Sequence, residues 1–217
     1  IYTNASNTLT HKQIIPIKTH ILGIFDDPIP TISKYVKPQL MEGDIVTIGE
    51  SPLAIMQGNY IHPSNIKYTI VARLLSSFFH PTSSLATACG MQALIDKSGP
   101  TRVLLAWLIG GFLKLFQIKG IFYRLAGHQA RLIDDITGTT PPYDQTIVLG
   151  PSNPKEFCEQ ASLALGSQFA IVDVNDLGRV KILASSKNCD QRKIITSLVD
   201  NPAGNADQLT PIVIIRN

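Results

Sequence analysis

The chain has 217 residues, of which 44% are hydrophobic and only 16% are charged. This composition excludes an intrinsically disordered chain and is sufficient for a sizeable core. The formal net charge of +3 comes from scattered lysines and arginines, with no basic run of the kind that follows a nucleic-acid backbone. We therefore expect no nucleic-acid partner.

Three widely spaced cysteines, Cys89, Cys158 and Cys189, form no CxxC or Cys–His metal pattern. They are typical of thiols in a reducing compartment, so we expect a cytoplasmic protein. Residues 1–13 are polar and are expected to form a leader. The rest, residues 14–217, has the length of a single domain or of two intertwined lobes.

Strand and helix patterns alternate in the first part of the chain. A β-branched stretch at 14–24 is broken by Pro16, and a buried strand is expected at 45–49. Apolar residues at helical spacing predict helices, and Gly99-Pro100 marks a helix end. The expected helices are 31–36, 51–56, 66–79, 85–97 and 101–115. Residues 120–126 are aromatic and predict a strand.

Short apolar runs dominate the second part of the chain. Pro154 and Glu156 suit the first turn of a helix over 154–165. Strands are expected at 146–149, 169–172, 180–184 and 211–215. Together these elements predict an α+β fold with a mixed, largely antiparallel sheet and helices packed on it.

The longest apolar stretch runs from 103 to 116 and is interrupted by Gly110, Gly111 and Lys114. It is shorter than the roughly 18–20 apolar residues that a bilayer-spanning helix needs. We therefore expect no membrane span and predict a buried helix. The alternative is a helix that lies on a membrane surface.

An acidic turn follows the predicted strand at 169–172. Asp173, Asn175 and Asp176 come just after this strand and precede Gly178. Carboxylate and amide oxygens are the ligands that a hard cation prefers, so the turn is a candidate Mg²⁺ or Mn²⁺ site. The other interpretation is a turn in which Asp and Asn bind their own backbone.

A second acidic pair, Asp134-Asp135, precedes Thr137-Gly138-Thr139. Adjacent carboxylates repel each other unless a positive charge lies near them. If the two acidic turns converge, they make a divalent-metal pocket. A helix cap or an exposed turn is the alternative interpretation of this pair.

The order of several segments carries a family resemblance. Ile15-Pro16-Ile17 is a proline-containing apolar strand, and Gly43-Asp44 precedes a second hydrophobic strand. Ala126-Gly127 and Ile133-Asp134 follow, then Leu149-Gly150-Pro151 before a helix, then segment 171–179 with its Gly178-Arg179, and then the closing strand at 210–216. In this order the segments resemble the coenzyme F-420 γ-glutamyl ligase family.

That resemblance implies a ligase-like fold, a homodimer, and an enzyme that uses GTP to join L-glutamate to a small-molecule carboxylate. It places divalent metal at Asp134 or Asp135 and at Asp173. Without a gap in the alignment, Asn175 takes the position of the second aspartate and Asp176 that of the neighbouring threonine. The resemblance also implies nucleotide contacts at Pro16, Ile17, Glu50 and Ser51.

Two departures from the family favour a different function. The family has a lysine that contacts the nucleotide, and Ile55 stands at that position. An isoleucine supplies no cation for a triphosphate. The segment 180–209 is also much shorter than its family counterpart. The alternative is a non-catalytic protein that binds a ligand or partner on the ligase scaffold.

Overall fold

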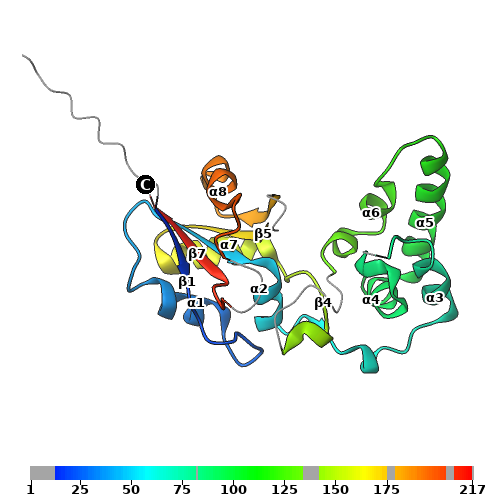
Figure 1. Cartoon of the computed structure of the whole chain (residues 1–217), viewed down its shortest axis with the longest axis horizontal. Helices are drawn as coiled ribbons and strands as arrows, with labels where there is room; N and C mark the ends of the chain where they lie inside the picture. Colours follow the sequence, from blue (N-terminus) through cyan, green and yellow to red (C-terminus); the bar gives the residue numbers. More distant parts are fainter. Residues whose placement is uncertain (1–12, 82, 134–141, 175–178, 204–207, 217) are drawn as a thin grey trace, which may run out of the picture.

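A computed structural model describes residues 13–81, 83–133, 142–174, 179–203 and 208–216. It shows two lobes along the long axis of the molecule (Figure 1). The sheet lobe contains the five-stranded sheet and the helices packed on it. The helical lobe (residues 66–133) is inserted between two short strands, β3 (Tyr60–Ile61) and β4 (Ile147–Val148), which pair with each other.

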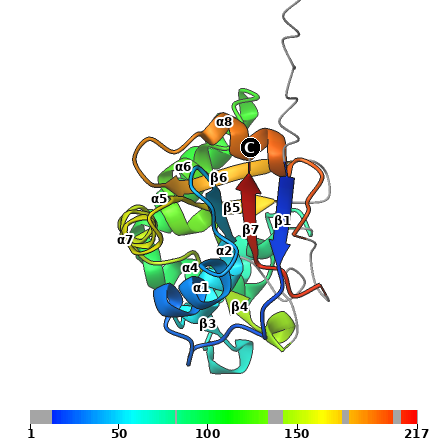
Figure 2. The ribbon, with the colours of Figure 1, turned by 90° about the vertical axis from the view of Figure 1, so that its left-hand side faces the viewer.

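The main sheet has the strand order β1-β7-β2-β5-β6. Only the β2–β5 pair is parallel among its four strand pairs, and the other three are antiparallel. The fold is therefore α+β with a mixed, largely antiparallel sheet, as the sequence predicts. Figure 2 shows β1 beside β7 at one edge. The strands are β1 (Gln13–Ile17), β2 (Ile45–Gly49), β5 (Gln168–Val174), β6 (Val180–Ser185) and β7 (Ile212–Arg216).

Both faces of the sheet are covered, which explains why its central strands are continuous β-branched runs. One face packs against α1 (Pro28–Val36), α2 (Glu50–Met56) and α7 (Pro154–Leu165). The other face packs against α8 (Gln191–Leu198) through Ile194 and Leu198. In Figure 1, α8 and α1 accordingly lie on opposite sides of the sheet.

The helical lobe has its own apolar core. Its helices are α3 (Ile70–Ser76), α4 (Ala88–Ser98), α5 (Pro100–Leu115) and α6 (Ile121–Leu125). Gly99, at φ +87°, ends α4, and Pro100 begins α5 at once, so the Gly-Pro pair both stops one helix and starts the next. Short 3-10 turns complete the chain path: η1 (Pro63–Asn65), η2 (Ser84–Ala86), η3 (His128–Arg131) and η4 (Tyr143–Gln145).

One expected element has the wrong type, and one helix was not expected. Residues 120–126 were expected to form a strand, but Gly120 takes a left-handed conformation and begins helix α6. Phe122 of α6 packs against Gly110 of α5, where an added β-carbon would lie 3.0 Å from Phe122 Cβ. This close helix contact overrides the aromatic, strand-like composition. Helix α8 was not expected, although Asp190 caps its first turn.

The long apolar helix is also not buried as predicted. In α5 only Val103 and Ala106 are buried, and they face the core of the helical lobe. The remaining large side chains are mostly exposed, because α5 lies at the outer surface of that lobe (Figure 1). Within the described ranges, no helix has the length and apolarity required to cross a membrane.

Candidate functional site

The carboxyl ends of β2 and β5 bring two predicted site residues together. These strands are parallel, and Gly49 lies opposite Val172 in their register. Glu50 and Asp173 are the next residues along each strand direction, so they reach the same edge of the sheet. Neighbouring loops at the carboxyl ends of strands are frequent positions for binding residues.

A single ammonium group lies between these carboxylates. Lys181 Nζ is 3.8 Å from Glu50 Oε2 and 3.7 Å from Asp173 Oδ2. Asp173 and Lys181 are Cα partners in the antiparallel β5–β6 ladder, which places their side chains side by side. The Glu50 side chain is only 10% exposed, whereas that of Asp173 is 54% exposed. The cluster is therefore half buried and opens to solvent on the Asp173 side.

The charges of this cluster indicate what it can hold. Two carboxylates that converge require a positive charge, since like charges at short range repel. Lys181 supplies that charge, and its long side chain is 44% exposed, so it has room to move. Paired carboxylate oxygens are also the donors that Mg²⁺ and Mn²⁺ prefer. The donor set of Glu50 and Asp173 thus fits a hard divalent cation, with Lys181 as its competitor.

The other predicted metal ligands are outside the described residues: Asp134, Asp135, Asn175 and Asp176. Among the residues that are described, no group of three or more His, Cys, Asp or Glu side chains is close enough to hold a metal ion. Among the described residues, Glu50 and Asp173 are therefore the two candidate carboxylates, and they contact the same lysine.

The predicted nucleotide contacts lie along the same edge. Ile17 ends β1 and pairs with Ile212, which in turn pairs with Ile48 of β2, so the end of β1 is level with the end of β2. The Ile17 side chain is buried in the core, while Pro16 is exposed. Ser51 follows Glu50 in α2 and is partly exposed.

Ile55 is on the buried side of α2. It packs with Ala54 and Val148, and Tyr60 and Tyr143 close the cluster. A side chain in this position contributes to the joint between α2 and the β3–β4 pair. Residue 55 therefore supplies packing and no positive charge.

Lys181 is the residue of this cluster that sequence reasoning missed. It lies in β6, within the strand predicted at 180–184, and no sequence motif marks it as a site residue. The short sequence separation between Asp173 and Lys181 was a usable signal. If two consecutive strands pair as antiparallel neighbours, residues at this separation lie opposite each other. The contact with Glu50 could not be predicted, since it depends on the parallel pairing of β2 with β5.

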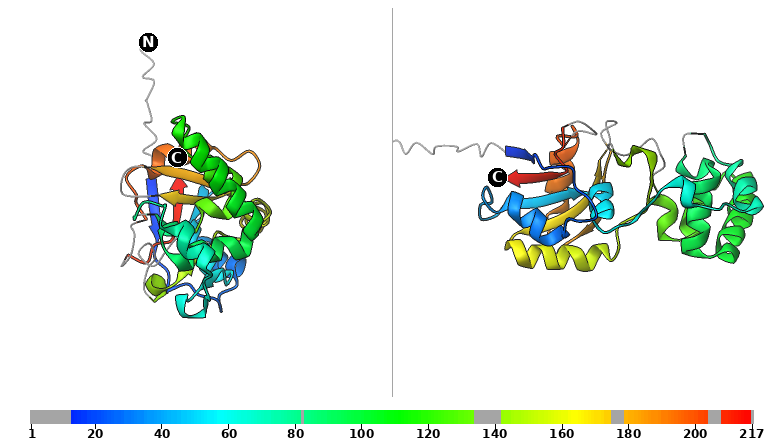
Figure 3. Two further views of the ribbon diagram at one scale, coloured as in Figure 1. Left: turned by 90° about the vertical axis from the view of Figure 1, so that its right-hand side faces the viewer. Right: turned by 90° about the horizontal axis from the view of Figure 1, so that it is seen from below.

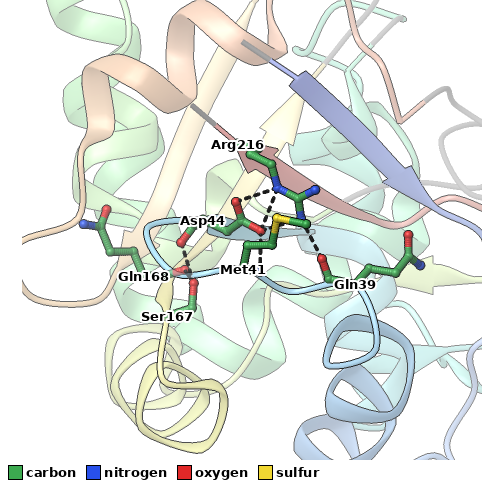
Figure 4. Close-up of polar contacts among 6 residues, drawn as sticks. All are labelled: Gln39, Met41, Asp44, Ser167, Gln168 and Arg216. Carbon is green, nitrogen blue, oxygen red and sulfur yellow. Dashed lines mark hydrogen bonds and ion pairs between the residues drawn. The ribbon is translucent and has the colours of Figure 1, made fainter. Parts of the chain in front are cut away.

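A second charged cluster has a structural role (Figure 4). It lies at the other end of the central strands, where β2 begins and β7 ends. Arg216 Nε is 3.0 Å from Asp44 Oδ1, and Arg216 Nη2 is 2.8 Å from Asp44 Oδ2. Arg216 also donates to the Gln39 carbonyl, and the Met41 N–H donates to Asp44. Ser167 Oγ donates to the Asp44 carbonyl. These bonds hold the loop before β2 against β7 and β5.

The pKa of Asp44 reflects this arrangement. Burial acts to raise it, but the hydrogen bonds from Arg216 and the Met41 N–H, together with the positive charges of Arg216 and Lys193, hold the pKa below its ordinary value of 3.8. The same contact raises the pKa of Arg216. Both groups therefore stay charged at neutral pH, and the pair holds the loop before β2 in place.

A hollow of about 370 Å³ lies in the helical lobe, away from either carboxylate cluster in sequence and fold. Tyr123 and Arg131 are the ionisable residues among those described as lining it, together with Ser83 and Ser84. It contains no acidic side chain from the described residues, so it does not match the chemistry predicted from the sequence. The carboxyl edge of β2 and β5 is the better candidate site.

Comparison with models of protein families gave no match, and comparison with curated protein sequences also gave none. The resemblance to γ-glutamyl ligases therefore rests on the sequence segments named earlier.

Proposed function

We propose that this protein is a cytoplasmic, homodimeric, metal-dependent ligase that uses GTP to join L-glutamate to a small-molecule carboxylate. The single observation that supports this proposal is the convergence of Glu50 and Asp173 on Lys181. Glu50 was expected to contact the nucleotide and Asp173 to bind metal, and they lie on different segments of the chain. Their meeting at one strand edge is what a combined metal and nucleotide site requires.

The roles of the residues follow from their charge and burial. Glu50 and Asp173 would hold Mg²⁺ or Mn²⁺, and the bound metal would neutralise the phosphate charge during phosphoryl transfer. Lys181 would move from the carboxylates toward a phosphate oxygen when the metal enters. This movement would supply the cation that Ile55 does not. The edge would also position the amine of glutamate close to the activated carboxylate.

A second candidate function is a non-catalytic binding protein on the same scaffold. The observation that favours it is the burial of Ile55, which is 5% exposed in the joint beside α2. In this alternative Lys181 stays paired with Glu50 and Asp173, and the site does not take up GTP. The two functions therefore differ in whether Lys181 is released.

Calorimetric titration of GTP distinguishes them. The titration is run with and without Mn²⁺ on the unaltered protein, on Asp173→Asn and on Glu50→Gln. We expect GTP binding that requires Mn²⁺ and that each substitution weakens by about tenfold or more, since a charged ligand to the metal is lost.

The matched control is Glu42→Gln, which removes an exposed carboxylate before β2, at the other end of that strand. It should bind GTP like the unaltered protein. If GTP fails to bind in the presence of Mn²⁺, the ligase proposal is wrong and the binding-protein alternative takes its place. Detectable glutamate-dependent GTP hydrolysis would exclude that alternative.

A further inference from the structure

Helix α5 presents a continuous apolar face to solvent. Its inward side carries Val103, Ala106 and Gly110, which pack into the helical lobe. The side chains that point away recur at helical spacing over the full length of the helix. Each of them is between 42% and 80% exposed: Leu104, Leu105, Leu108, Ile109, Phe112, Leu115 and Phe116. Exposed apolar surface of this extent indicates a binding surface for another molecule or for a membrane.

The apolar face extends beyond α5. Phe78, just after α3, stacks edge-on against Trp107 of α5 with ring centroids 4.9 Å apart. Ile70, Val71 and Leu74 of α3 are also exposed. Both helices lie at the end of the helical lobe that points away from the sheet (Figures 1 and 3). We call the exposed apolar residues of α3 and α5, with Phe78 and Phe116, the outer face.

The charge of the chain is divided between the lobes. Residues 66–133 contain eight lysines and arginines and one acidic residue, Asp96, which gives this segment a formal charge of +7. Because the whole chain carries +3, the remaining residues together carry −4. Arg73, Lys114, Lys119 and Arg124 of the helical lobe are all exposed.

We propose that the outer face docks on the surface of a membrane that contains anionic lipids. A helix of 16 residues is about 24 Å long, which is too short to cross a bilayer core of about 30 Å, so its apolar face would lie along the membrane surface. Leucine and phenylalanine side chains would enter the boundary between headgroups and acyl chains. The lysines and arginines around them would meet anionic headgroups.

The charge division argues against a second copy of the chain as the occupant. Packing two outer faces together would bring two lobes of charge +7 into contact, and like charges oppose such an association. An anionic bilayer satisfies both the apolar face and its basic surroundings. Docking would leave the carboxylate edge of the sheet lobe free, so this inference is independent of the proposed ligase function.

Vesicle co-sedimentation tests the proposal on the full chain. Vesicles of phosphatidylcholine mixed with phosphatidylglycerol are compared with vesicles of pure phosphatidylcholine, at low and at high salt. We expect co-sedimentation with the anionic vesicles, and a decrease at high salt, because the lysine and arginine contacts are screened. Equal binding to both vesicle types, or none to either, would overturn the proposal.

Paired substitutions distinguish vesicle binding through the outer face from non-specific adsorption of the protein to vesicles. The variant Leu108→Ala/Phe112→Ala keeps the helix propensity of α5 and should lower vesicle affinity by about tenfold or more. Its control is Leu163→Ala, which alters an exposed leucine on α7 of the sheet lobe. Lys114→Gln/Lys119→Gln should also weaken binding, whereas Lys155→Gln/Lys187→Gln should not.

Circular dichroism checks that every variant keeps its helix content. The sedimentation velocity of the lipid-free protein identifies the competing occupant. Self-association that Leu108→Ala/Phe112→Ala abolishes, without any vesicle binding, would assign the outer face to a second copy and overturn the membrane proposal. Vesicle binding that survives this double substitution would overturn it as well.

Discussion

Glu50 and Asp173 share one counter-ion, because Lys181 Nζ lies 3.8 Å from the first carboxylate and 3.7 Å from the second. Asp173 belongs to β5, Glu50 begins α2 directly after β2, the parallel neighbour of β5, and the lysine belongs to β6. Three elements from different parts of the chain thus build one charged cluster. The arrangement links the fold to the proposed function.

The first prediction concerns the lysine of this cluster. In Lys181→Gln the carboxylates lose the ammonium group that lies between them, so a divalent cation no longer competes with it. We expect the affinity for Mn²⁺ alone to rise several-fold, as measured by calorimetry without nucleotide. Lys155→Gln, on α7, is the control and should leave the affinity unchanged. A weaker affinity in Lys181→Gln would show that the lysine does not occupy the cation position.

The second prediction concerns the ion pair between Asp44 and Arg216, at the start of β2 and the end of β7. Asp44 is almost completely buried and accepts hydrogen bonds from Arg216 and from the Met41 N–H. Asp44→Asn removes the charge that these donors face, which should lower the free energy of unfolding by about 2 kcal/mol at pH 7. Urea denaturation measures this difference, with Glu42→Gln as the exposed control. Equal stability of Asp44→Asn and the unaltered protein would contradict the structural role of the pair.

The same pair gives a pH dependence. The pKa of Asp44 is lower in the folded protein than its ordinary value of 3.8, so its contribution to stability is complete above that value. The contribution is lost as the pH falls through the lower, folded pKa. The stability difference between the unaltered protein and Asp44→Asn should therefore shrink below about pH 4. A difference that stays constant between pH 7 and pH 2 would contradict this account.

Local sequence patterns were sufficient for much of the fold. The β-branched run of β2 and the Pro154 start of α7 were both predicted correctly, because strand burial and the fixed φ of proline act over a few neighbouring residues. The pattern failed at α6, where contact with Gly110 determines the conformation. It also failed on the burial of α5, since an apolar helix looks the same whether it faces a core or an interface.

The candidate site was predicted only in part. Glu50 and Asp173 were both named as site residues from the sequence. Their closeness in space depends on the pairing of β2 with β5, two strands that are far apart in the sequence. Lys181 carries no motif of its own. Long-range strand pairing is therefore the information that the local patterns lacked.

The third prediction uses two glycines that sit inside helices. A β-carbon on Gly90 of α4 would lie 2.3 Å from the backbone oxygen of Ser84, whereas one on Gly111 of α5 would meet nothing within 4 Å. Gly90→Ala should therefore destabilise the protein by about 1–3 kcal/mol through overpacking. Gly111→Ala should stabilise it by roughly 0.5–1 kcal/mol, because alanine favours the helix. Thermal unfolding of both variants measures the contrast, and equal effects would contradict the packing of α4 on η2.

The fourth prediction concerns the thiols of the sheet lobe. Burial raises the pKa of Cys158 to about 12 and that of Cys189 to about 11. At pH 8 both are almost entirely protonated, and the thiolate is the reactive form. In a Cys89→Ser background, labelling by a disulfide reagent should be about a hundredfold slower in the folded protein than in urea. Rapid labelling of Cys158 itself without urea would show that its thiol, on the inner side of α7, is not packed against the sheet.

Binding of Mn²⁺ to a double-substitution cycle tests the central claim most directly. Free Mn²⁺ is followed by electron paramagnetic resonance in the unaltered protein, Glu50→Gln, Asp173→Asn and the double variant. If the two carboxylates hold one ion, each single substitution lowers the affinity by about tenfold or more, and the double variant is little worse than either. Unchanged affinity in the single variants, or two independent losses that add, would contradict a shared cation site at the carboxyl edge of β2 and β5.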